Sequence, residues 1–164
     1  MATAPPAAGD PLRDTLTTSD LRNAADRDED AIVQLEIVSN GGLEVQGIED
    51  RLVQVFRNLI ANANTFSPPG GSIRISLSRH DGWLVTTIDD DGPGVPEGKE
   101  KDIFNRFYSA RPEGEKFGTH SGLGLSISKQ IIDVHEGVIE ATNRRDGQGN
   151  VVGARFIVRL PASE

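Results

Sequence analysis

The chain contains no cysteine, and its 164 residues include only one tryptophan, one tyrosine and one methionine. Without cysteine, disulfide bonds, thiolate metal ligands and a cysteine nucleophile are excluded, which is compatible with a reducing cytoplasm. No apolar run approaches the roughly 18 residues that a membrane span needs, and we expect no secretory signal. Basic residues are outnumbered, 17 against 25 acidic ones, giving a net charge of −8. This balance disfavours unaided binding to nucleic acid or acidic lipid, which depends largely on Lys and Arg.

Length and composition indicate one globular domain with a short tail. Hydrophobic residues make up 36% of the chain and charged residues 26%, which is typical of a folded domain. Residues 1–11 are small and rich in proline, so we expect a disordered tail or a cloning remnant there. The predicted domain covers residues 12–164 and begins with a loose helical pattern over 12–26.

The spacing of apolar residues predicts strands and helices in alternation. Apolar residues at intervals of three and four over 48–66 predict an amphipathic helix that stops at Ser67-Pro68-Pro69. Asn40-Gly41-Gly42 suggests a hairpin turn between the first strand and residues 43–46. The other predicted elements are strands over 31–39, 72–79, 83–89, 138–142 and 151–160, and helices over 97–107 and 122–135.

Polar and glycine motifs interrupt this pattern at several points. Asn58 and Asn62 are four residues apart on the first amphipathic helix and share one face. Asp90 follows a strand and leads the turn Gly92-Pro93-Gly94, while Gly122-Leu123-Gly124 opens the last helix. Taken singly, each motif has an ordinary interpretation: the asparagines could be solvated, the Asp90 segment could be a common acidic turn, and the glycine pair could arise by chance. In this order they indicate a split nucleotide site.

The motif set, with Phe104-Asn105-Arg106-Phe107-Tyr108 between the two glycine boxes, resembles the catalytic and ATP-binding domain of sensor histidine kinases, in the GHKL or Bergerat superfamily. The resemblance covers about residues 31–161, and the segment 107–128 is most similar to ChvG-type envelope sensor kinases of alphaproteobacteria. It implies an α/β (α+β) two-layer sandwich, with a mixed five-stranded sheet covered on one face by about three helices. ATP would lie between the helices and a loop over 109–120.

The resemblance also assigns roles within the site. Asp90 would accept a hydrogen bond from the adenine amine, and Asn62 would supply an oxygen to Mg²⁺, which needs few protein ligands beside phosphates and water. Asn58 stands where hydrolytic relatives carry a glutamate base; an amide cannot be a general base, which favours transfer over hydrolysis. Asn58 and Asn62 are the catalytic candidates. The full nucleotide-binding set is Asn58, Asn62, Asp90, Gly92, Gly94, Arg106, Tyr108, Lys116, Ser121, Gly122, Leu123 and Gly124.

The sequence departs from the family pattern at Ala61, Thr65 and Glu136. Thr65 stands where many relatives have a phosphate-contacting lysine, so the phosphate charge must be met elsewhere. Arg106, together with residues 111 and 116 in the predicted loop, provides the nearest cations along the chain. Glu136 replaces a glycine of the usual His-Gly-Gly.

None of the three histidines lies in the His-Glu context of a phosphoacceptor. The leading hypothesis is therefore a protein-histidine kinase catalytic domain that donates the γ-phosphoryl group of Mg²⁺-ATP to a helical hairpin absent from this chain. A response regulator would follow downstream. The isolated domain would be monomeric, whereas the parent protein would be a homodimeric inner-membrane kinase with this domain in its cytoplasmic part. The alternatives are a stand-alone serine kinase of the anti-sigma-factor type and a nucleotide-gated interaction module without chemistry.

Overall fold

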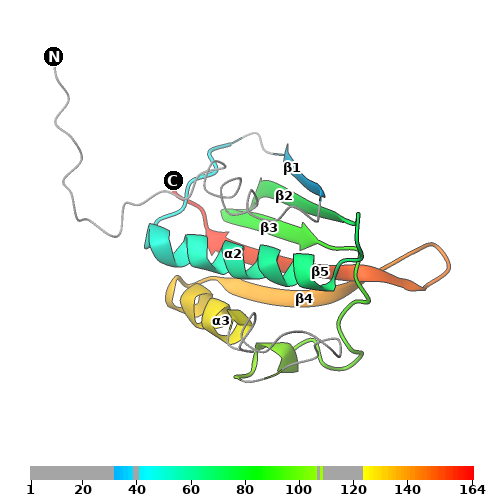
Figure 1. The fold of residues 1–164 in the computed structure, drawn as a ribbon. Helices are drawn as coiled ribbons and strands as arrows, with labels where there is room; N and C mark the ends of the chain where they lie inside the picture. The colour runs from blue at the N-terminus through cyan, green and yellow to red at the C-terminus, as the bar shows by residue number, and fades with distance from the viewer. Residues whose placement is uncertain (1–31, 39–40, 107, 109–123) are drawn as a thin grey trace, which may run out of the picture.

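The computed structural model describes residues 32–38, 41–106, 108 and 124–164 (Figure 1). No helix in these ranges is long and apolar enough to cross a bilayer. In chain order, the elements are β1 Ile32–Val38, α2 Glu49–Phe66, β2 Ser72–His80, β3 Trp83–Asp89, the 3₁₀ turn η1 Asp102–Phe104, α3 Gly124–Val134, β4 Val138–Arg145 and β5 Val151–Pro161.

The strands form one mixed sheet in the order β1-β2-β3-β5-β4. β1 runs parallel to β2, and the remaining neighbours are antiparallel. Parallel neighbours require a crossover connection, which α2 provides between β1 and β2. Both α-helices lie on the same face of the sheet (Figure 1). The predicted α+β fold with a mixed five-stranded sheet is confirmed.

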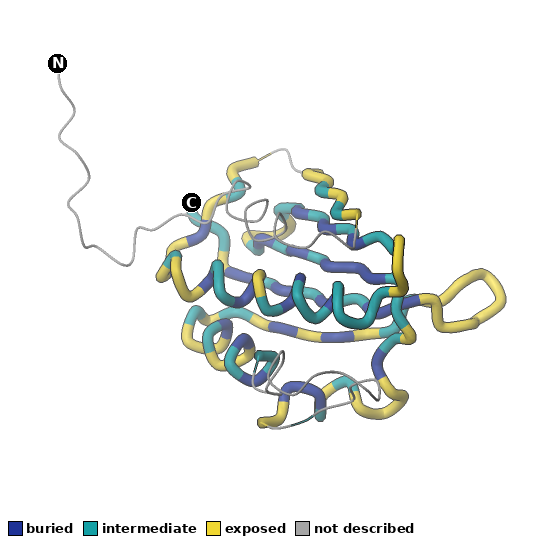
Figure 2. Tube along the Cα trace, in the orientation of Figure 1, coloured by how far each residue is buried: buried dark blue, intermediate teal, exposed yellow. Residues whose placement is uncertain are grey.

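The hydrophobic core lies between the helices and the sheet (Figure 2). The apolar side chains of α2 that were predicted from their spacing are at most 2% exposed: Leu52, Val55, Phe56, Leu59, Ile60 and Ala63. Burying a large apolar side chain contributes about 1.5–3 kcal/mol. This burial fixes the rotation of α2, and with it the direction of the asparagines beside the apolar stripe.

The predicted hairpin after the first strand is wrong. β1 pairs along its whole length with β2. Val45 instead forms a bridge with Ala162, and the N–H of Ser163 donates to the carbonyl of Glu44 at 2.7 Å. The alternation of apolar residues identified the strand but carried no information about its partner.

The part of the chain that the structure describes contains two α-helices, not about three. Residues 97–107 contribute only the short turn η1, in which Ile103 and Phe104 are buried. The ring of Phe104 meets that of Phe156 edge-on, with centroids 6.2 Å apart, so one turn is enough to anchor the segment. The helix predicted over 12–26 lies outside the described residues. β4 continues three residues beyond its predicted end at 142.

A histidine links the end of α3 to the beginning of α2. Nε2 of His135 accepts a hydrogen bond from the N–H of Ile48 at 3.0 Å, and Nδ1 lies 2.7 Å from the carbonyl of Ile131. An N–H can only donate and a carbonyl can only accept, so Nδ1 carries the hydrogen. The side chain is therefore engaged at helix ends.

The chain leaves α3 through a left-handed residue, Glu136, with φ at +59°. A side chain in this conformation costs about 1–2 kcal/mol, and glycine avoids most of the cost. We expect Glu136→Gly to raise the free energy of unfolding by about 1 kcal/mol, as measured by urea denaturation. Glu136→Ala is the control, since it removes the carboxylate but keeps the Cβ. Equal stabilisation by both variants would contradict the explanation.

Candidate functional site

A cavity of about 350 Å³ lies between α2, the start of α3 and the loop that follows β3. This volume is within the range of small-molecule sites. The residues around it come from segments that are far apart in the sequence: Asn58, Ala61, Asn62, Thr65 and Phe66 from α2, Asp90 and residues 93–96 from the loop, Ile103, Tyr108, Gly124, Leu125, Ala154 and Phe156.

Both predicted asparagines line this cavity, but their surroundings differ. Nδ2 of Asn58 donates to the carbonyl of Gly124 at 3.3 Å and to Oγ of Ser128 at 3.4 Å. Asn58 thus ties α2 to the first turn of α3. The side chain of Asn62 makes no hydrogen bond to any residue that the structure describes. Its amide is therefore available to a ligand.

Asp90 forms part of the cavity wall although it is only 2% exposed. Its Oδ1 accepts hydrogen bonds from the N–H groups of Gly92 at 2.9 Å and Ala154 at 3.0 Å. Oδ2 accepts none from the described part of the chain. Burial raises the pKa of Asp90, while the two backbone bonds and the charge of Arg144 oppose that rise. An acceptor without a partner at the cavity wall favours a ligand that brings a donor.

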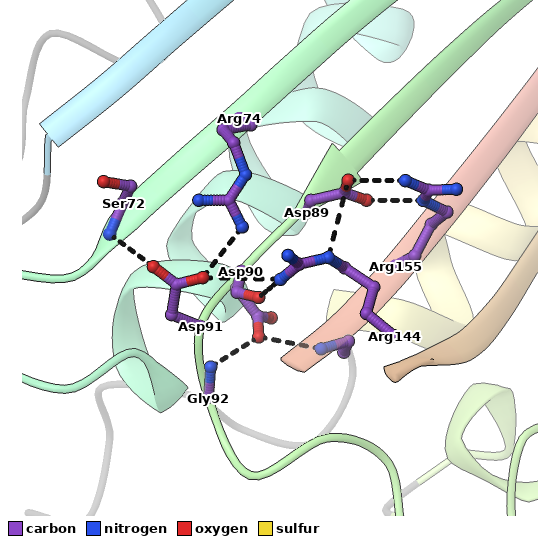
Figure 3. A network of polar contacts seen from close by, with 9 residues as sticks. Ser72, Arg74, Asp89, Asp90, Asp91, Gly92, Arg144 and Arg155 are labelled. Atoms are coloured by element: carbon purple, nitrogen blue, oxygen red, sulfur yellow. Dashed lines mark hydrogen bonds and ion pairs between the residues drawn. The ribbon is translucent and has the colours of Figure 1, made fainter. Parts of the chain in front are cut away.

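The neighbours of Asp90 are held in ion pairs (Figure 3). Arg155 holds Asp89 through two hydrogen bonds of 2.7 Å, and Arg74 pairs with Asp91 at 2.8 Å. The hydrogen bond from Arg74 is the largest cause that lowers the pKa of Asp91, to about 2. Of the three consecutive aspartates, only Asp90 lines the cavity.

Arg144, on β4, lies between these pairs and touches all three aspartates (Figure 3). Its Nη1 donates to the carbonyl of Asp90 and lies 3.4 Å from Oδ1 of Asp91. Its Nε lies 3.7 Å from Oδ2 of Asp89. The apolar alternation of β4 stops at residue 142, so nothing in the sequence indicated that Arg144 belongs to the strand.

The loop after Asp90 is fastened to β4 and α2. Oδ1 of Asn143 accepts from the N–H of Val95 at 2.6 Å, and its Nδ2 donates to the Val95 carbonyl at 2.9 Å. A Cβ on Gly94, whose φ is +82°, would lie 2.6 Å from Asn143 Oδ1, and one on Gly92 would lie 2.6 Å from the carbonyl of Phe66. The packing of the loop thus requires both glycines before any ligand is considered.

The other predicted residues divide into three groups. Tyr108, Thr65 and Gly124 line the cavity, and Gly124 is the first residue of α3. Arg106 is exposed and does not line the cavity. The remaining positions, which are Lys116, Ser121, Gly122, Leu123 and the predicted loop 109–120, lie outside the described residues.

Residues 47–164 match the model of one protein family, the histidine kinase-, DNA gyrase B- and HSP90-like ATPases. The chain belongs to this family. The matched region contains every site residue named above and all of the elements except β1. Within this ATPase family, the chain is a catalytic domain of the sensor histidine kinase type.

Two relatives of this ATPase domain are sensor proteins named ChvG. The protein from Rhizobium meliloti (strain 1021) is 45% identical over 119 residues, which are 72% of this chain and 21% of that protein. The protein from Agrobacterium fabrum is 46% identical over 121 residues, 73% of this chain and 20% of that protein. The chain therefore spans about a fifth of the length of these relatives.

A solved structure of a mycobacterial sensor histidine kinase, MprB, has a TM-score of 0.71 to this chain at 28% identity, and the match covers 87% of this chain and 89% of that one. Together with the ChvG matches, this confirms the resemblance to sensor kinases of the ChvG type that the motifs suggested.

Proposed function

We propose that this domain binds Mg²⁺-ATP in the cavity and donates the γ-phosphoryl group to a histidine on a helical hairpin outside this chain. The observation that carries the proposal is the convergence of Asn62, Asp90 and Gly124 on one cavity from three separate segments. The domain would act in two-component signalling, on the cytoplasmic side of a homodimeric membrane kinase, with a response regulator downstream. Its membership of the ATPase family supports this reading.

The base of the nucleotide would lie at the Asp90 end of the cavity. Oδ2 of Asp90 accepts no hydrogen bond from the described residues, and the adenine amine would supply the missing donor. Hypoxanthine and guanine carry an oxygen at that position, which would face the carboxylate unfavourably. Tyr108 and the loop at Gly94 border the same cavity and would enclose the base.

The phosphates would lie at the end formed by Asn62 and the start of α3. The oxygen of the Asn62 amide is a hard ligand of the kind Mg²⁺ takes, with phosphate oxygens and water completing the octahedron. The described residues contain no cluster of three or more acidic, histidine or cysteine ligands, which agrees with such a sparse site. Backbone N–H groups at the start of α3 would face the phosphates. Arg106 and Lys116 would supply the charge that Thr65 lacks.

The chain's own residues would act by positioning more than by proton transfer. Asn58 cannot remove a proton, and its bonds to Gly124 and Ser128 hold the start of α3 in place. A neutral imidazole nitrogen of the acceptor is itself a nucleophile and needs no base. The site therefore favours transfer to histidine over hydrolysis.

The test is transfer from radiolabelled ATP and Mg²⁺ to a purified phosphoacceptor hairpin of the Rhizobium meliloti ChvG protein. We expect acid-labile phosphate on the hairpin and none on this chain incubated alone. A hairpin whose acceptor histidine is replaced by glutamine is the control, and it should stay unlabelled.

Other outcomes of this experiment would decide against the proposal. Acid-stable label would indicate a serine kinase of the anti-sigma type. Nucleotide binding without transfer to any acceptor hairpin would indicate an interaction module. Stoichiometric label on His80, His120 or His135 of the chain alone would show that no separate acceptor is needed.

A further inference from the structure

We propose that Arg144 is a positioning residue that sets the base selectivity of the site by fixing the backbone of Asp90. The inference rests on the proposed reading of adenine by Asp90. Arg144 does not line the cavity, and it would act only through the aspartate in front of it.

Two hydrogen bonds to backbone groups hold Asp90 against β5. Its N–H donates to the carbonyl of Ala154 at 3.0 Å, and its Oδ1 accepts from the N–H of the same residue at 3.0 Å. These two bonds attach one side of Asp90 to β5. They leave its own carbonyl, and hence the peptide plane between Asp90 and Asp91, to be fixed by another group.

Arg144 is that group. Its Nη1 donates to the Asp90 carbonyl, while contacts to Asp89 and Asp91 brace the guanidinium from both sides. A Cβ on Gly153 would overlap the same carbonyl oxygen, so the carbonyl is enclosed between β4 and β5. Losing the guanidinium would free this peptide plane to rotate. The N–H of Gly92, which follows this peptide in the chain and donates to Oδ1 of Asp90, would move with it, so the direction of Oδ2 toward the cavity would change.

Arg144 also acts on Asp90 through its charge. Among the described residues, the charged groups around Asp90 are Arg144 from β4, Arg74 from β2, Arg155 from β5, and its neighbours Asp89 and Asp91. The α2 residues that line the cavity are all neutral. The positive charge of Arg144 lowers the pKa of Asp90, and the negative charge of Asp91 raises it. Removing Arg144 therefore raises the pKa of Asp90, so that the carboxylate becomes protonated closer to neutral pH.

The experiment compares Arg144→Met, Arg144→Lys and Arg155→Met with the parent protein. Arg155→Met is the matched control, because it removes an equal charge from the same network but from a residue that pairs with Asp89 alone. The affinities of ADP and of inosine diphosphate are measured by calorimetry from pH 5 to pH 8. Inosine diphosphate replaces only the amine by an oxygen, so the affinity ratio reports on the base contact.

The parent is expected to prefer ADP by roughly tenfold or more, the value of one charge-assisted hydrogen bond. Arg144→Met should reduce this ratio to about threefold or less, which corresponds to half of that free energy. As the pH is lowered, ADP binding by this variant should begin to weaken at a higher pH than in the parent. Arg144→Lys should keep the pH dependence but lose selectivity, since one ammonium group cannot span three partners. Arg155→Met should keep the parent ratio.

A ratio in Arg144→Met equal to that of the parent would overturn the role of Arg144 and leave the role of Asp90 intact. If Arg144→Met does not fold, an unchanged ratio in Arg144→Lys overturns it equally. An equal loss of selectivity in Arg155→Met would also overturn it, because general damage to the network would then explain the effect. A parent protein with no preference for ADP would overturn the adenine contact and this inference together.

Discussion

Replacing Asp90 by asparagine is expected to weaken the binding of ADP and ATP alike, by roughly tenfold or more. The new amide can keep an oxygen in the place of Oδ1, so the N–H groups of Gly92 and Ala154 retain their acceptor. The change falls on Oδ2, where an amide donor would face the amine of adenine. Because the contact is made to the base, the loss should be the same for both nucleotides, whereas inosine diphosphate should bind no worse.

The Asp90→Asn variant should also be folded at neutral pH. Burial raises the pKa of Asp90 in the folded protein. The contribution of this group to stability is therefore full below its unfolded pKa and is lost as the pH rises through the folded pKa. An amide does not titrate and avoids this loss. Thermal unfolding of the variant at pH 7 checks the fold before any affinity is compared.

Asp146→Asn is the matched control for that experiment. Oδ1 of Asp146 also accepts from two backbone N–H groups, those of Gln148 at 2.9 Å and Asn150 at 3.0 Å, but it lies in the exposed turn between β4 and β5. The affinity of the Asp146→Asn variant for ADP, measured by calorimetry, should equal that of the parent. Unchanged ADP binding in a folded Asp90→Asn protein would remove Asp90 from the base site.

The sequence predicted the main elements well because each has a periodic apolar pattern. The three-and-four spacing along α2 and the alternation in β2, β3 and β5 depend only on which face of an element is buried. The same patterns cannot say which strands pair. β1 was therefore identified as a strand but given the wrong partner, and its parallel pairing with β2 follows from the crossover through α2.

The site was predicted where its residues form short motifs, and missed where they act across long distances in the chain. Asn143 and Arg144 look like loop residues because polar side chains succeed one another there. In the structure they belong to β4, and their partners are about fifty residues away, at Val95 and Asp90. The three consecutive aspartates at the end of β3 look alike in the sequence, which did not show which of them would face the cavity. The arginines across the sheet make that difference.

Replacing Asn62 by alanine is expected to remove the dependence of ATP affinity on Mg²⁺ and to slow phosphoryl transfer to the acceptor hairpin by on the order of 100-fold or more. The physical reason is the loss of the hard oxygen that α2 presents to the cavity. The side chain of Asn62 has no hydrogen bond to other described residues, so the change should leave the fold intact. AMP, which lacks the outer phosphates, should bind as it does to the parent.

Asn64→Ala is the control for this variant, because it makes the same change on the same helix, two residues along, at a position that does not line the cavity. ATP affinity is measured with Mg²⁺ and with a chelator, and transfer is followed with radiolabelled ATP. The ratio of the two affinities should be near one in Asn62→Ala and equal to the parent ratio in Asn64→Ala. If Asn62→Ala still binds ATP more tightly with Mg²⁺, the ion is held by another residue, and Asn62 would then contribute only shape to the cavity wall.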